Sequence, residues 1–141
     1  MGLGRFGGGL AAAESLLAEG RQVLVTDLAE EAALQAAVTK LRETFGAQVR
    51  FRLGGHEQED FAQAELVIAN PAVPQPWDNP YLQTAWASGA TVTTEIARTL
   101  GQLIDRKTIA ITGSAGKSTT TAMRSEDTRL NSSHTVISYA V

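Results

Sequence analysis

Short apolar runs alternate with amphipathic stretches along most of this 141-residue chain. The apolar runs are four to six residues long and mostly rich in β-branched residues, which is typical of buried strands. We expect strands at residues 22–26, 49–53, 66–69, 91–94 and 107–112. The stretches between them carry helix formers with apolar positions at helical spacing. We expect helices at residues 10–19, 28–45, 56–64, 81–88 and 95–104.

Strands and helices that alternate in this way predict an α/β fold, with a parallel sheet covered by helices. A polar link at Asp105–Arg106 precedes the last expected strand, and we place a domain boundary there. The expected domains are residues 1–105, residues 106–123 and a tail at residues 124–141.

Composition and charge narrow the classes of function. The formal net charge is −3, with acidic and basic residues interspersed, which is unlike a nucleic-acid-binding surface. Cysteine is absent, so neither disulfides nor thiolate metal sites are expected. No apolar run approaches the roughly 20 residues of a membrane span, and no signal-peptide pattern opens the chain. We expect a cytoplasmic monomer with neither nucleic-acid nor membrane partners.

The first candidate site is a glycine-rich loop at residues 2–7. Gly2, Gly4 and Gly7 have the spacing of dinucleotide-binding loops, in which they allow a tight turn, close approach of a pyrophosphate and close helix packing. Asp27 ends the next strand, where its carboxylate can contact a ribose or a base, or merely cap a helix. The loop predicts a nucleotide-diphosphate site; a turn kept only for helix packing is the alternative.

The second candidate site follows the last expected strand, in Thr112-Gly113-Ser114-Ala115-Gly116-Lys117-Ser118-Thr119. Backbone N–H groups of such a loop wrap phosphates, a lysine reaches the β- and γ-phosphates, and a hydroxyl binds Mg²⁺. We therefore expect ATP and Mg²⁺, with Lys117 as the catalytic residue and Ser118 as the metal ligand. The expected phosphate-binding residues are Gly113, Ser114, Ala115, Gly116, Lys117, Ser118 and Thr119.

Both ends of the chain depart from a complete domain pattern. A loop of the first type should follow a strand, and only Met1 precedes it, so we expect the first strand of a Rossmann-like domain to be missing. That loss would leave two buried strand edges without a partner. After Met123 the apolar helical pattern stops, and residues 124–141 resemble a translated sequencing adapter. A divergent native helix end and strand is the alternative for this tail.

The two loops together resemble the Mur ligase family, over Met1 to Met123. Four stretches carry the resemblance: Gly2–Gly7, Thr26–Asp27, the turn at Ile68–Val73 and Thr94–Ile96, besides the short form of the second loop. The family's UDP site maps onto Gly4, Arg5, Phe6, Gly7, Asp27, Asn70, Pro71 and Ala72. Ala72 stands where the family often has glycine, which puts the shape of that turn in doubt.

The resemblance implies a fragment of an ATP-dependent ligase of peptidoglycan synthesis. Such an enzyme adds D-glutamate to UDP-N-acetylmuramoyl-L-alanine through an acyl phosphate, and the fragment alone is expected to be inactive. The residues leave two other classes open. A Rossmann domain of an NAD-dependent dehydrogenase explains the first loop only, and a non-catalytic nucleotide-binding module explains both. A sister ligase of the same pathway is a further alternative.

A histidine and two tryptophans could bind ligands, but we predict structural roles for all three. We expect His56 to be a loop or cap residue rather than a ligand. We expect Trp77 and Trp86 to pack under the proline-rich loop at residues 70–80.

Overall fold

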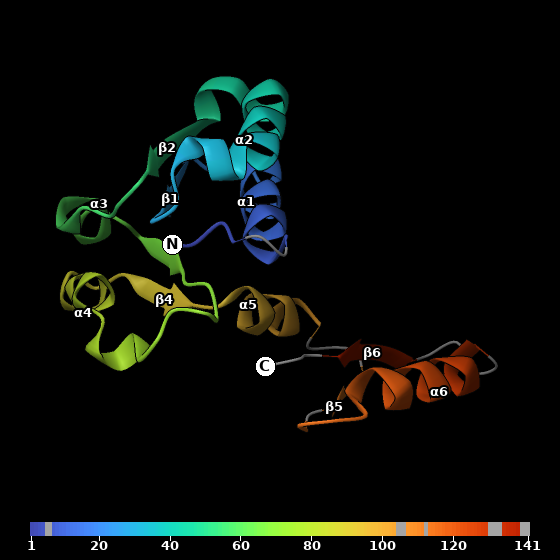
Figure 1. Ribbon diagram of the computed structural model, residues 1–141. Coiled ribbons are helices and arrows are strands. Elements are labelled where there is room, and N and C mark those ends of the chain that lie inside the picture. The colour runs from blue at the N-terminus through green and yellow to red at the C-terminus, as the bar shows by residue number, and fades with distance from the viewer. Residues whose placement is uncertain (5–6, 104–106, 112, 130–133, 139–141) are drawn as a thin grey trace. The chain divides into compact units, whose positions relative to one another are not determined.

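The computed structural model describes residues 1–4, 7–103, 107–111, 113–129 and 134–138 (Figure 1). The chain divides into two compact units, Met1–Arg98 and Thr99–Val141. Within the described ranges, no helix is both long enough and apolar enough to cross a membrane.

The first unit contains the strands and helices that the apolar pattern predicts, with small shifts at their ends. Its strands are β1 (Val23–Asp27), β2 (Val49–Leu53), β3 (Leu66–Ile68) and β4 (Thr91–Thr93). Its helices are α1 (Gly8–Ala18), α2 (Glu31–Phe45), α3 (Gln58–Ala62) and α4 (Pro80–Ala87), with 3₁₀ turns η1 (Gly46–Gln48) and η2 (Pro76–Asp78). Helix α5 (Glu95–Gln102) begins in this unit and ends in the second.

The strands of this unit pair in parallel, as predicted, and in the described residues they form two separate pairs. β1 pairs with β2, with Val23 opposite Val49, and β3 pairs with β4, with Leu66 opposite Thr91. The amino-terminal residues stand between β1 and β3 (Figure 1), because the Met1 amine donates to the Ile68 carbonyl and the Gly2 N–H donates to the Thr26 carbonyl.

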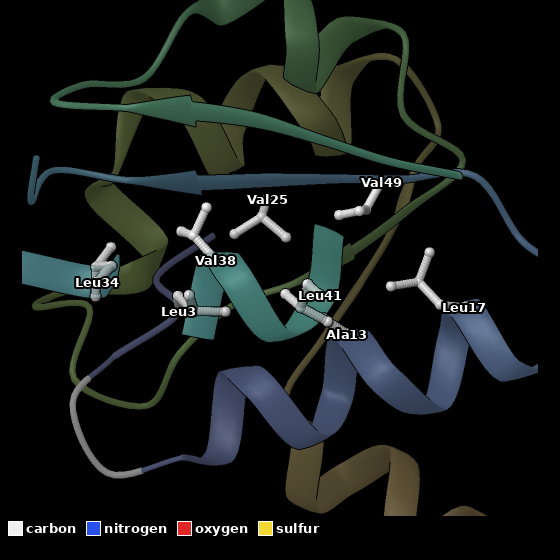
Figure 2. Packing of buried hydrophobic residues seen from close by; sticks show 8 residues of the cluster. All are labelled: Leu3, Ala13, Leu17, Val25, Leu34, Val38, Leu41 and Val49. Atoms are coloured by element: carbon white, nitrogen blue, oxygen red, sulfur yellow. The ribbon is translucent and has the colours of Figure 1, made fainter. Parts of the chain in front are cut away.

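Two apolar cores stabilise the first unit, one beside each strand pair. The first joins α1, α2, β1 and β2 (Figure 2) and consists of Leu3, Ala13, Leu17, Val25, Leu34, Val38, Leu41 and Val49. The α2 residues recur every three or four positions, which places them on one helix face. The second core joins α3, α4, β3 and β4 and consists of Phe61, Val67, Ala69, Leu82, Ala85 and Ala90. Each fully buried leucine contributes about 1.5–3 kcal/mol.

Helix α2 begins later than predicted, at Glu31 instead of Leu28. The Asp27 carboxylate accepts a hydrogen bond from the Ala29 N–H at 2.9 Å, which holds residues 27–29 in a local turn. Leu28 consequently points into solvent and is 72% exposed.

The expectation that both tryptophans pack under the proline-rich loop is wrong. Trp77 is 65% exposed and Trp86 is 46% exposed. Val73 and Tyr81 pack against the second core from this region.

The second unit contains β5 (Lys107–Ile111), α6 (Lys117–Arg129) and β6 (His134–Ser138). β5 and β6 are parallel, with Lys107 opposite His134. The helix continues past Met123, where the apolar pattern stops, because neither glycine nor proline interrupts it before Arg129. The origin of residues 124–141 stays a prediction.

Candidate functional site

The first glycine loop begins between β1 and β3 and leads into α1. Gly2 and Gly4 have φ angles of 78° and 69°, in the left-handed region where only glycine is relaxed. Gly7, with φ 84°, is the N-cap residue of α1 and has no side chain that could cap the first turn of the helix. Arg5 and Phe6, both predicted to contact UDP, lie outside the described residues.

Asp27 fixes the loop to the carboxyl end of β1. One carboxylate oxygen accepts from the N–H groups of Leu3 at 2.8 Å and Gly4 at 3.3 Å. The other oxygen accepts from Ala29. The alternative role as a helix N-cap is wrong, because Glu30 occupies that position of α2. Contact between Asp27 and a ligand stays a prediction, and such a ligand would share a carboxylate that already orders the loop.

Asn70 holds the same loop from the side of β3. Its N–H donates to the Met1 carbonyl at 3.0 Å, and its Nδ2 donates to the Gly2 carbonyl at 3.4 Å. A Cβ at Gly2 would lie 2.8 Å from Asn70 Cβ, and one at Gly4 would lie 2.8 Å from Asn70 Nδ2. Asn70 therefore makes any side chain at these two glycines a steric clash.

The turn after Asn70 is built by that same residue. The Asn70 Oδ1 accepts from the Ala72 N–H at 2.9 Å, and the Asn70 carbonyl accepts from the Val73 N–H at 3.0 Å. Pro71 and Ala72 are exposed on this turn. The turn forms with alanine at the position where the family often has glycine.

Close packing of α1 depends on Gly9 instead of Gly7. A Cβ at Gly7 would meet nothing within 4 Å, whereas one at Gly9 would lie 2.4 Å from the Leu3 carbonyl oxygen. The sequence analysis missed this role, although Gly8 and Gly9 directly follow the motif and were a readable signal.

Glu95 was missed as a neighbour of the same helix. A Cβ at Gly8 would lie 2.3 Å from both carboxylate oxygens of Glu95, so this carboxylate lies against the first turn of α1. Gly8 and Glu95 are 87 positions apart in the sequence, so no local sequence pattern could predict this contact.

The pKa values of two groups near the first glycine loop are lowered, namely those of the Met1 amine and the His56 ring. Burial lowers the pKa of the Met1 amine to about 6, although the Asp27 charge opposes the change. Burial also lowers the pKa of His56, helped by the positive amino terminus. The His56 ring lies edge-on to Tyr81 at 5.2 Å and to Phe61 at 5.9 Å between ring centroids. His56 is thus part of an aromatic group at the second core.

The second glycine loop connects β5 to α6, which is the strand–loop–helix context that a phosphate-binding loop requires. Gly113 has a φ angle of 147° and Gly116 one of 78°. The Lys117 Nζ donates to the Gly113 carbonyl across the loop. The Thr120 N–H and Oγ1 both donate to the Gly116 carbonyl, at 2.9 Å each.

The predicted phosphate-binding residues of this loop are open to solvent. Those from Gly113 to Gly116 are exposed, as are Ser118 and Thr119, and Lys117 is half-buried. Binding of a phosphate chain by this exposed loop and the Lys117 amine stays a prediction. For Mg²⁺ the fit is incomplete, since the described residues hold no group of three or more His, Asp or Glu side chains that could bind a metal ion.

Comparison with known proteins places the chain in a family. Residues 1–94 match the family described as Mur ligase MurD-like, N-terminal domain. UDP-N-acetylmuramoylalanine–D-glutamate ligases of Geobacter metallireducens and Roseiflexus sp. are each 42% identical, over 84% and 87% of this chain. The same-named protein of Trichlorobacter lovleyi is 38% identical over 97% of this chain.

The matched part is about a quarter of each of these relatives, namely 25%, 25% and 29%. The region matched by the family includes the first glycine loop, Asp27 and Asn70, which the structure brings together. The chain therefore belongs to the family of Mur ligase MurD-like N-terminal domains.

Proposed function

We propose that the first unit binds the UDP moiety of UDP-N-acetylmuramoyl-L-alanine, as part of a cytoplasmic ligase that adds D-glutamate in peptidoglycan synthesis. One observation carries the proposal. Asp27 and Asn70 hold the glycine loop from opposite strands, within the residues that match the family. The names of the relatives supply the substrate and the amino acid that is added.

The loop suits a diphosphate because it leads directly into the first turn of α1. The first turn of α1 offers N–H groups and the positive end of the helix dipole, which favour phosphate. Gly7 adds no side chain to that turn, against which the Glu95 carboxylate lies, and the Asn70 side chain packs against Gly2 and Gly4. The exposed turn with Pro71 and Ala72 lies next to Asn70, where it can contact the nucleoside.

The second loop is proposed to bind the ATP phosphates. Bound ATP would supply a phosphoryl group that turns a poor leaving group, the carboxylate oxygen of the substrate, into a good one. Lys117 would neutralise the charge between the two anions, and the Ser118 hydroxyl would be one ligand of Mg²⁺. The amine of D-glutamate would then displace phosphate from the acyl phosphate, and an amide would form.

We expect the 141 residues alone to bind ligands without joining them. They span about a quarter of the relatives, and the described residues contain no cluster of three or more side chains that could hold a metal ion. D-Glutamate and the remaining metal ligands are assigned to the rest of the enzyme.

Calorimetric titration of the chain tests the first part of the proposal. UDP-N-acetylmuramoyl-L-alanine and UDP should bind to the first unit, and NAD should not. Gly4→Ala should weaken UDP binding at least tenfold, because its Cβ would displace Asn70 Nδ2. Tighter binding of NAD than of UDP would favour the dehydrogenase alternative.

Gly20→Ala is the matched control. Gly20 has a φ angle of 81°, like the loop glycines, but its Cβ would meet nothing within 4 Å. This variant carries the same backbone strain, about 1–2 kcal/mol, without touching Asn70. Equal loss of UDP binding in both variants would refute the role given to the loop.

A further inference from the structure

Helix α5 is held in the first unit by polar contacts more than by an apolar core. Its residues are exposed or half-buried, and it supplies none of the buried side chains of the two cores. Its first turn follows β4, where the Thr94 Oγ1 accepts from the Ala97 N–H at 3.2 Å and the Thr94 carbonyl accepts from the Arg98 N–H at 3.0 Å. A helix with few buried apolar contacts opens at a low cost in free energy.

Two charged side chains of α5 lie against opposite ends of α1. A Cβ at Gly8 would collide with both carboxylate oxygens of Glu95, so this carboxylate lies at the first turn of α1. The Arg98 guanidinium forms an ion pair with Glu19, the residue that ends α1. Anions are stabilised at the amino end of a helix dipole and cations at the carboxyl end. The charges of α5 therefore match the dipole of α1 at both of its ends.

The contact of Arg98 with Glu19 is only partly satisfied. The Arg98 side chain is 20% exposed, and its buried Nε has no hydrogen-bond partner among the described residues. A buried donor without a partner lowers stability. Exposure of the guanidinium to water would give this N–H group a partner, so part of the cost of breaking the ion pair would be recovered.

The first turn of α1 is also where the diphosphate of the ligand is proposed to bind. The N–H groups of that turn and the positive end of the dipole attract any anion. The Glu95 carboxylate already lies beside them. Two anions a few ångströms apart repel each other, and more strongly where water is excluded. The diphosphate and the Glu95 carboxylate therefore compete for one helix turn.

We propose that ligand binding displaces the Glu95 carboxylate from the first turn of α1 and thereby releases α5 from α1. This inference rests on the proposed binding of UDP to the first unit. Helix α5 ends in the second unit, and the chain continues from it to β5 and the second glycine loop. Occupation of the UDP site would thus loosen the segment that leads to the proposed ATP site, and such coupling between two sites is reciprocal.

Amide hydrogen exchange of the 141-residue chain, with and without UDP, tests the release. The N–H groups of residues 99–102, at the end of α5, should exchange about threefold faster when UDP is bound. Those of residues 84–87 in α4, which packs in the second core, should not change. In Glu95→Gln, the α5 groups should exchange at the faster rate before UDP is added. Unchanged or slower exchange of α5 in the UDP complex would overturn the proposal.

Arg98→Gln separates release of α5 from a simple effect of charge. Loss of a positive charge should by itself weaken the binding of an anion. If α5 has to be released, however, loss of the ion pair with Glu19 makes the release easier, and UDP should bind about twofold tighter. Weaker binding of UDP to Arg98→Gln would overturn the proposal. Glu43→Gln, which neutralises an exposed carboxylate of α2, is the matched control and should leave the Kd unchanged, because salt screens distant charges.

Calorimetry distinguishes failure of this inference from failure of the proposed function. If UDP binds neither to the original chain nor to Glu95→Gln, the proposed function is refuted, and this inference with it. If UDP binds to both with the same Kd, the UDP site stands and this inference alone is overturned. Circular dichroism establishes that each variant folds. If Arg98→Gln does not fold, Glu95→Gln and the exchange of α5 in the original chain still decide.

Discussion

Both candidate sites of this chain are glycine-rich loops, but the two loops are held in different ways. The first loop is fixed by residues far away in the sequence, since Asp27 bonds Leu3 across 24 positions and Asn70 bonds Gly2 across 68. The second loop is held by contacts between residues four positions apart, such as the Lys117 amine on the Gly113 carbonyl. Cβ atoms at Gly113 and Gly116 would meet no atom closer than 3.6 Å.

The difference separates two reasons for a glycine. At Gly2 and Gly4 the neighbouring Asn70 excludes a side chain, and the loop is shaped before a ligand binds. At Gly116 the φ angle alone requires glycine, and space around it stays open. A preformed loop loses less conformational entropy when it binds, so we expect the first loop to act mainly through affinity and the second through the charge that Lys117 brings.

Lys117→Ala gives the largest expected effect and tests this division directly. It should be introduced into a chimaera in which this chain replaces the matching quarter of the Geobacter metallireducens ligase. We expect the ligation rate to fall about 10²–10³-fold, as for loss of a charge-stabilising donor, with the Kd for the UDP-sugar unchanged. Release of phosphate and calorimetry measure the two quantities.

Lys40→Ala is the control for that experiment. Lys40 is exposed and forms a surface ion pair with Glu14, a contact worth about 0–1 kcal/mol. Its loss should change neither the rate nor the Kd. Ligation that survives in the Lys117→Ala chimaera would remove the role assigned to Lys117.

A second test uses pH, because the first loop begins at a buried amine. The pKa of the Met1 amine is about 6 in the folded chain, below its ordinary value of 8.0, which applies to the unfolded chain. Between these values the unfolded state binds more protons, so the free energy of unfolding rises with pH. We expect a gain of about 2 kcal/mol between pH 6 and pH 8 in urea titrations.

Acetylation of the amino terminus should remove most of that pH dependence. His56 contributes with the same sign, since its folded pKa is also lowered, but its contribution lies below pH 6.5. An equal slope between pH 6 and pH 8 in the acetylated chain would mean that the amine is not buried as the structure has it.

Local sequence patterns predicted the helices and strands, whereas contacts between residues far apart in the sequence became known only from the structure. Residues Leu34, Val38 and Leu41 lie on the buried face of α2, as their spacing predicts. The start of that helix was missed because the Asp27 carboxylate forms a turn with Ala29, and both residues also fit a helix. The prediction for Trp77 was wrong because a large apolar side chain favours burial in general. The sequence does not show that Val73 and Tyr81, instead of Trp77, pack against the second core.

The candidate site shows the same limit. Spacing alone identified Gly2, Gly4 and Gly7, and the end of a strand identified Asp27. The side chain that crowds two of these glycines, Asn70, was predicted as a ligand contact, and its structural role appeared only in three dimensions. The missing first strand had predicted two strand edges without a partner, and β1 and β3 are not paired with each other in the described sheets.

Gly9→Ala and Gly116→Ala compare a glycine with no room for a side chain and a glycine with open space around it. A Cβ at Gly9 would lie 2.4 Å from the Leu3 carbonyl, so α1 must move away from the loop, at a cost of about 1–3 kcal/mol. Gly116→Ala, in open space, should cost about 1–2 kcal/mol of strain in the second unit and leave the first unit unchanged. Urea unfolding measures stability, and UDP titration should show weaker binding for Gly9→Ala alone.

Glu95→Gln is the smallest expected change, and it acts at the helix turn that follows the first loop. The Glu95 carboxylate lies against Gly8, where it complements the positive end of the α1 dipole. Its neutralisation should lower stability by about 0.3–1 kcal/mol. A diphosphate at the same turn would no longer face a negative charge, so the affinity for UDP should rise about two- to fivefold. Stability and affinity that fall together would mean that Glu95 only supports the helix, and opposite changes would place the ligand's phosphates at its first turn.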